Sequence, residues 1–135
     1  MVYVTRRVSF SSAHRLNNAA LTPEENSRIF GKCNNPNYHG HNYVLEVVVA
    51  GEIDPATGYV FDLKILKEIL NEHILSKVDH KNLDLDVDFL KGVITTTENL
   101  AVAIWKQLED KIPHGKLYSV KLYETENNYI EYKGE

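Results

Sequence analysis

Four stretches of the chain predict β-strands, and in two of them, residues 2–10 and 118–124, hydrophobic and polar residues alternate. The first stretch runs from Val2 to Phe10, where Arg6 interrupts an otherwise apolar face. Alternation of this kind is typical of a strand that is buried on one side only. The other three predicted strands cover residues 39–50, 118–124 and 129–133.

Two further stretches repeat their apolar residues every three or four positions, the spacing of a helix that buries one face. The first extends from Leu63 to about Ile74, and Asp62 is its predicted N-cap. The second runs from about Glu98 to Lys111. Residues 15–38 contain clusters of Asn and Pro and predict a long connection, a feature that is often functional in a small domain.

The predicted order is ββααββ, which indicates an α+β fold. Two helices would cover one face of a four-stranded antiparallel sheet. A sheet of this kind has two open edges, which small domains must protect from uncontrolled pairing. We therefore expect homo-oligomers that form by strand-to-strand association.

Composition mainly excludes classes of protein. At 135 residues the chain fits one domain, residues 1–135, because two halves would be too small to bury good cores. A net charge of −4 gives no reason to expect nucleic acid or an anionic membrane as partner. No apolar run approaches the ~18–20 residues of a membrane span. A single cysteine excludes an internal disulfide, so we expect a reduced, cytoplasmic protein.

Three histidines form a candidate metal site. His39 and His41 are two residues apart on a predicted strand, so their side chains point to the same face. A catalytic zinc site typically has three protein ligands and one open position. His14 is the best third ligand, because antiparallel pairing of the first two strands would bring it beside the other two. The pair alone is weak evidence, since many such pairs are ordinary surface or core histidines.

Cys33, Asp79 and His80 are candidates for proton transfer. Cys33 is either a small apolar residue beneath a loop or a thiolate base, and the sequence leaves both readings open. A carboxylate next to a histidine can orient the imidazole ring. Because adjacent side chains rarely pair directly, we expect His80 to meet Cys33 across the fold. The structural alternative for His80 is a histidine favoured by a helix C-terminus.

Glu124 continues the apolar face of the third predicted strand. A carboxylate in that position must be paired or bound, because burial of a free charge is costly. It is either an anchor for a planar heterocycle with adjacent N–H donors, or a carboxylate that emerges into solvent as the strand ends.

The segment Thr95-Thr96-Thr97-Glu98 precedes the second helix. It predicts a capping box in which Thr95 and Glu98 satisfy the free amides of the helix. The same hydroxyl and amide groups could bind the polar edge of a ligand.

Residues 30–43, Phe-Gly-Lys-Cys-Asn-Asn-Pro-Asn-Tyr-His-Gly-His-Asn-Tyr, closely resemble the 6-pyruvoyl-tetrahydropterin synthase family, and its animal-type enzymes in particular. The supporting stretches cover almost the whole chain; they are residues 7–16, 51–58, 79–84, 96–99, 122–125 and 132–135. The main departure is Tyr38, where the family usually has glycine. A bulky ring beside His39 could reshape the rim of the pocket.

The resemblance implies a role for each matching residue. His14, His39 and His41 match the zinc ligands of the family. Cys33 matches the catalytic proton acceptor, and Asp79 with His80 matches its activating pair. Glu124 matches the carboxylate that anchors the pterin ring, and the adjoining pterin-pocket segment matches Thr96, Thr97 and Glu98.

The resemblance also implies a fold, an assembly and a reaction. The fold is the tunnelling (T-fold) type, whose subunits join sheets into a trimer, and two trimers stack into a homohexamer with sites between subunits. The reaction converts 7,8-dihydroneopterin triphosphate to 6-pyruvoyl-tetrahydropterin and triphosphate, in tetrahydrobiopterin biosynthesis. Zn²⁺ is the implied cofactor, and Mg²⁺ would accompany the triphosphate. Two alternatives stay open: a related lyase of the dihydroneopterin side chain, such as a 6-carboxytetrahydropterin synthase, and a non-catalytic pterin-binding module.

Overall fold

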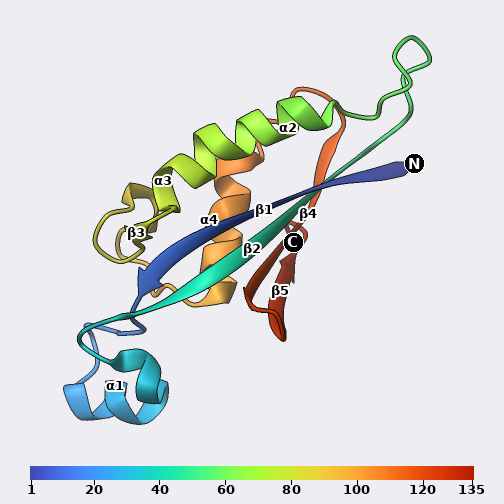
Figure 1. Ribbon diagram of the computed structural model, residues 1–135. Coiled ribbons are helices and arrows are strands. Elements are labelled where there is room, and N and C mark those ends of the chain that lie inside the picture. The colour runs from blue at the N-terminus through green and yellow to red at the C-terminus, as the bar shows by residue number, and fades with distance from the viewer.

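A single five-stranded sheet organises the chain, and the computed structural model describes all of it, residues 1–135. The strand order across the sheet is β3-β1-β2-β4-β5 (Figure 1). The strands are β1 (Val2–His14), β2 (His39–Gly51), β3 (Lys81–Asn82), β4 (Lys116–Thr125) and β5 (Asn128–Tyr132).

The prediction of a four-stranded antiparallel sheet was therefore wrong in one respect. The extra strand, β3, is only two residues long and pairs parallel to β1, with Ser12 opposite Lys81. Two residues are too few to produce a visible alternation, so the sequence pattern could not indicate this strand. The α+β class is confirmed. The four predicted strands are present, and each pairs antiparallel with its neighbour among them.

The two predicted helices cover one face of the sheet, where the apolar core lies (Figure 1). Helix α2 (Leu63–Leu70) continues through a π-helical turn, Asn71–Leu75, into the short helix α3 (Ser76–Val78). The predicted N-cap is confirmed, because the Asp62 carboxylate accepts a hydrogen bond from the amide of Lys64. Helix α4 (Thr97–Leu108) buries Leu100, Ile104 and Leu108 against the strands.

The N-cap of α4 differs from the predicted one. The N-cap is Thr96, whose hydroxyl accepts from the amide of Asn99 at 3.2 Å. Thr95 was the predicted cap; instead, its side chain is fully buried and donates to Asp84. The capping box with Glu98 is therefore absent.

A third helix, α1 (Pro23–Phe30), lies within the connection that the sequence analysis treated as a loop. It begins with a complete capping box between Thr22 and Glu25, and proline occupies its first turn. A 3₁₀ turn, Gly31–Asn34, follows directly. In Figure 1 this unit lies beyond the end of the β1–β2 pair, apart from the helices over the sheet. A second 3₁₀ turn, Asp88–Leu90, precedes α4. None of the helices has the length and apolar character that crossing a membrane would require.

The register between β1 and β2 sets the position of the histidines. The two strands pair antiparallel along their full length, and His14 at the end of β1 lies opposite His39 at the start of β2. His41 is two residues further along β2, on the same face as His39. The predicted convergence of the three histidines is thus a direct consequence of strand pairing.

Candidate active site

Three imidazole rings meet at one end of the sheet, on the face that carries the core. His14, His39 and His41 each offer a ring nitrogen, and these three atoms lie within 4.8 Å of one another. The ring centroids are 4.6–5.1 Å apart, with His14 almost completely buried. This arrangement fits a metal site with three histidine ligands and an open position.

The hydrogen bonding of the rings supports the same conclusion. Nε2 of His14, Nε2 of His41 and both ring nitrogens of His39 are buried and have no hydrogen-bond partner. Buried polar atoms are nearly always paired, so a cluster of four unpaired nitrogens is unusual. A bound cation would satisfy one nitrogen of each ring, which is three of these four. The donor set, three imidazoles and no thiolate, suits zinc among several first-row metals.

The environment keeps the imidazoles ready to bind a cation. Burial lowers the pKa of His14; the hydrogen bond to the Thr95 carbonyl opposes this effect, and the charges of His39 and His41 add to it. Burial likewise lowers the pKa of His41, although the nearby carboxylate of Glu124 opposes this effect. Neutral imidazole is the form that binds metals.

Glu124 joins this centre to a second feature, a cavity of about 630 Å³. The Thr97 hydroxyl donates to one carboxylate oxygen of Glu124 at 2.7 Å, and the other oxygen lies 3.8 Å from Nε2 of His41. Glu124 is therefore paired on the core-facing side of β4 and does not emerge freely into solvent. The cavity is lined by all four residues predicted to contact a ligand: Thr96, Thr97, Glu98 and Glu124.

Asp79 and His80 lie at the edge of the sheet, beside β1, and they do pair directly. Nδ1 of His80 is 3.0 Å from the Asp79 carboxylate, which contradicts the expectation that these neighbours would not meet. The backbone of His80 is left-handed (φ 59°), a conformation that is uncommon for a residue other than glycine. The amide of Ser11 donates to the same carboxylate at 2.9 Å, and this bond is the main reason why the pKa of Asp79 is lowered.

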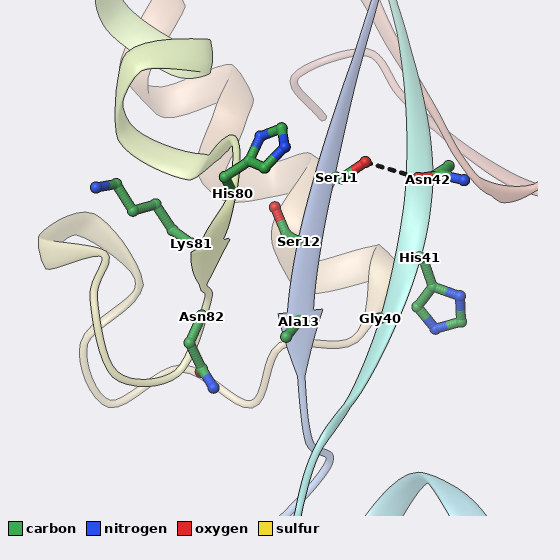
Figure 2. A pocket seen from close by; sticks show the side chains of 9 residues that line it. All are labelled: Ser11, Ser12, Ala13, Gly40, His41, Asn42, His80, Lys81 and Asn82. Atoms are coloured by element: carbon green, nitrogen blue, oxygen red, sulfur yellow. Dashed lines mark hydrogen bonds between the residues drawn. The ribbon is translucent and has the colours of Figure 1, made fainter.

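A polar groove of about 480 Å³ lies between this pair and the start of β2. Figure 2 shows His80 and Lys81 on one side of β1, with His41 projecting away on the other side of the view. Ser11 and Asn42 bridge the two strands through a hydrogen bond of 2.6 Å. The imidazole of His80 is largely exposed, so it is available to a group outside this chain.

Cys33 lies in the 3₁₀ turn after α1, half-buried and free of disulfide bonding. Its carbonyl accepts from the amide of Leu16 at 2.8 Å, which ties the turn to the segment that follows His14. The thiol makes no hydrogen bond to Asp79 or His80 within the chain. The three predicted proton-transfer residues are thus divided between two places in the subunit.

Two features of the site escaped the sequence analysis. The carboxylate of Asp84 accepts from the Thr95 hydroxyl, and the Thr95 carbonyl is 2.8 Å from Nδ1 of His14. No pattern distinguished Asp84 from its neighbours Asp86 and Asp88. Tyr43 is also fully buried, stacked on Phe10, with no partner for its hydroxyl. Burial raises the pKa of Tyr43, and the alternation of β2 had marked this residue only as core.

Comparison with known proteins identifies the family. The model of the 6-pyruvoyl tetrahydropterin synthase family matches residues 3–135. The chain belongs to this family. Human 6-pyruvoyl tetrahydrobiopterin synthase is 57% identical over 132 residues, which cover 98% of this chain and 91% of the human protein. The protein of the same name from Dictyostelium discoideum is 52% identical, with 99% and 97% covered.

A solved structure supports membership of the family independently. The structure of 6-pyruvoyl tetrahydropterin synthase from Caenorhabditis elegans superposes with a TM-score of 0.94 at 45% identity. It covers 99% of this chain and 96% of the other.

Proposed function

We propose that the chain is a 6-pyruvoyl-tetrahydropterin synthase. It converts 7,8-dihydroneopterin triphosphate to 6-pyruvoyl-tetrahydropterin and eliminates triphosphate, a lyase step of tetrahydrobiopterin biosynthesis in the cytoplasm. One observation carries the proposal beyond family membership. Glu124, which lines the cavity, lies 3.8 Å from His41 of the metal-binding triad, so one ligand can contact both groups.

In this proposal Glu124 anchors the substrate ring. A carboxylate can accept two adjacent N–H donors of a pterin at once, in the bidentate manner that gives such contacts their geometric specificity. The hydroxyl of Thr97 fixes the carboxylate, and the free amides at the start of α4 lie along the same wall, with Thr96 and Glu98. The ring plane is thereby set relative to the histidines, and a misplacement of ~1 Å could cost about 100-fold in rate.

His14, His39 and His41 would hold Zn²⁺ close to Glu124, the residue that also lines the cavity. The ion would act as a Lewis acid toward the hydroxyl oxygens of the substrate side chain. Because the chemistry is an internal redox, in which carbinols become ketones and a ring C=N bond is reduced, no nicotinamide is required. Mg²⁺ would accompany the triphosphate and neutralise part of its negative charge.

Cys33 is the proposed base, and Asp79 with His80 is its proposed activating pair. The thiolate removes a proton from a side-chain carbon, and the imidazole of His80, oriented by Asp79, holds the proton of the thiol. Within one subunit the pair is exposed at the edge of the sheet and Cys33 lies in a separate turn. We therefore propose that the complete site forms between subunits of a homohexamer built from two trimers.

The test is to supply 7,8-dihydroneopterin triphosphate and Mg²⁺ to zinc-loaded protein without oxygen. The proposal predicts that substrate disappears with stoichiometric release of triphosphate and without added nicotinamide. A non-catalytic pterin-binding protein would retain the substrate unchanged. Intact substrate after many hours, in protein shown to contain zinc, would overturn the proposal.

A further inference from the structure

We propose that Asp84 is a positioning residue for the metal ligand His14, and that it acts through Thr95. The inference rests on the metal site of the proposed function. It concerns a carboxylate that touches neither the metal site nor the cavity described above. Asp84 lies just beyond β3, the short strand that the sequence pattern did not reveal.

The carboxylate of Asp84 binds two groups that neighbour His14. One oxygen accepts from the backbone amide of Arg15, the residue directly after His14, at 2.7 Å. The other oxygen accepts from the hydroxyl of Thr95 at 2.8 Å. The carbonyl of that same threonine is 2.8 Å from Nδ1 of His14. One side chain therefore fixes both the backbone of the ligand and the group that contacts its ring.

These contacts determine which nitrogen of His14 carries the proton. An ionised carboxylate only accepts, so the Thr95 hydroxyl must donate its single proton to Asp84. The hydroxyl oxygen is also 3.4 Å from Nδ1 of His14, and it faces that atom as an acceptor. Both threonine oxygens near Nδ1 are thus acceptors, which places the proton on Nδ1. Nε2 keeps its lone pair, and Nε2 is the buried nitrogen without a partner.

Burial makes this arrangement difficult to replace. Thr95 has no exposed surface, and His14 is 1% exposed. Water therefore cannot easily substitute for a lost acceptor. An amide at position 84 has one accepting oxygen instead of two. When that oxygen accepts from Arg15, the NH₂ group faces the Thr95 hydroxyl, which then turns and donates to Nδ1. That rotation would act against the Thr95 carbonyl and favour the tautomer with a proton on Nε2, which cannot bind a metal through Nε2. Partners of this kind typically affect metal affinity when they are removed.

The experiment compares zinc affinity in Asp84→Asn and wild type by competition with a chromophoric chelator at fixed pH. We expect a loss of about 10- to 100-fold, the range found for groups that orient metal-bound histidines. Asp86→Asn is the matched control. Its carboxylate belongs to the same loop and accepts from the amide of Asn82, but it does not contact Thr95. We expect its zinc affinity to stay within about twofold of wild type, by the same reasoning.

A second pair of variants separates positioning from folding. Thr95→Ser keeps the hydroxyl and should bind zinc with an affinity close to that of wild type. Thr95→Val keeps the backbone carbonyl but loses the hydroxyl, and it should bind zinc more weakly. This pair decides the question if Asp84→Asn does not fold. Wild-type affinity in Asp84→Asn, an equal loss in Asp86→Asn, or equal affinities in the two Thr95 variants would overturn the inference. If the wild-type protein itself binds no zinc, the metal site of the proposed function fails as well.

Discussion

The hydroxyl of Thr97 donates a 2.7 Å hydrogen bond to the carboxylate of Glu124, which connects the start of α4 to the end of β4. Through this contact the helix fixes a charged group between the cavity and the histidine triad. The carboxylate is satisfied on one oxygen by the protein, and its other oxygen faces the metal-binding side. It can therefore accept further donors from a ligand without any rearrangement of the chain.

Glu124→Gln should weaken pterin binding while leaving the fold intact. The amide still accepts from Thr97, but it loses the charge that strengthens hydrogen bonds to ring N–H groups. The difference between charged and neutral hydrogen bonds predicts a loss of about 10-fold in affinity. Fluorescence titration with a dihydropterin measures it, and Glu68→Gln on the exposed side of α2 serves as control. Unchanged affinity in Glu124→Gln would remove the carboxylate from the binding site.

Cys33→Ala should abolish most turnover and leave zinc content unchanged. Loss of a general base typically costs about 10²–10⁴-fold in rate. The thiol is absent from the cluster of metal-binding nitrogens, so the metal should be retained. Measuring kcat and zinc stoichiometry on the same preparation separates the two effects. A variant that turns over at the wild-type rate would disprove the role as base, and one that lost its zinc would indicate a structural role.

The pH dependence of stability should reveal the contact of Asp79. The Ser11 amide and then His80 hold the pKa of this carboxyl below its usual range, so the folded state favours the ionised form. The contribution of this carboxylate to the free energy of unfolding is complete above the pKa of an unperturbed aspartate, about 3.9. It is lost as the pH falls through the lower pKa of the folded state. The gap in urea midpoint between wild type and Asp79→Asn should therefore be present at pH 7 and close in acid. Asp110→Asn, a surface control, should show no such gap. A gap of equal size at both pH values would contradict this account.

Tyr38 occupies a backbone conformation that favours glycine. Its φ of 68° is left-handed, which explains why glycine is usual here in the resembling enzymes. Such a conformation costs an ordinary residue about 1–2 kcal/mol. Inside a helix or strand, glycine makes a protein less stable than alanine does, by about 0.5–1 kcal/mol; at position 38 the order should be reversed. Urea unfolding of Tyr38→Gly and Tyr38→Ala tests this directly, since both variants lose the ring. Greater stability of the alanine variant would show that the position is not strained.

The sequence pattern predicted long elements well because alternation and helical spacing persist over many residues. It placed His14 beside His39 because pairing of two long strands leaves little freedom in register. Features that depend on one or two residues were missed or misplaced. Strand β3 is too short to show a period, and the cap of α4 fell on Thr96 because three threonines in a row offer equivalent chemistry.

Three other features of the structure were not predicted, either because their sequence signal was overlooked or because hydrophobic periodicity does not encode them. The start of α1 carries Thr22 and Glu25 at capping-box spacing, which the surrounding turn residues obscured. The contact between Asp79 and His80 depends on a left-handed backbone that periodicity does not encode. The link from Asp84 through Thr95 to His14 joins three segments distant in sequence. Only the three-dimensional fold brings them together.

Mass identification of the pterin product distinguishes the proposed synthase from other lyases of the same family. Zinc-loaded protein is incubated without oxygen with 7,8-dihydroneopterin triphosphate and Mg²⁺, and the product is analysed by mass spectrometry. The account predicts 6-pyruvoyl-tetrahydropterin, with all carbons of the side chain retained. A 6-carboxy or 6-hydroxymethyl pterin, which has lost side-chain carbons, would contradict the assignment and identify a different lyase on the same fold.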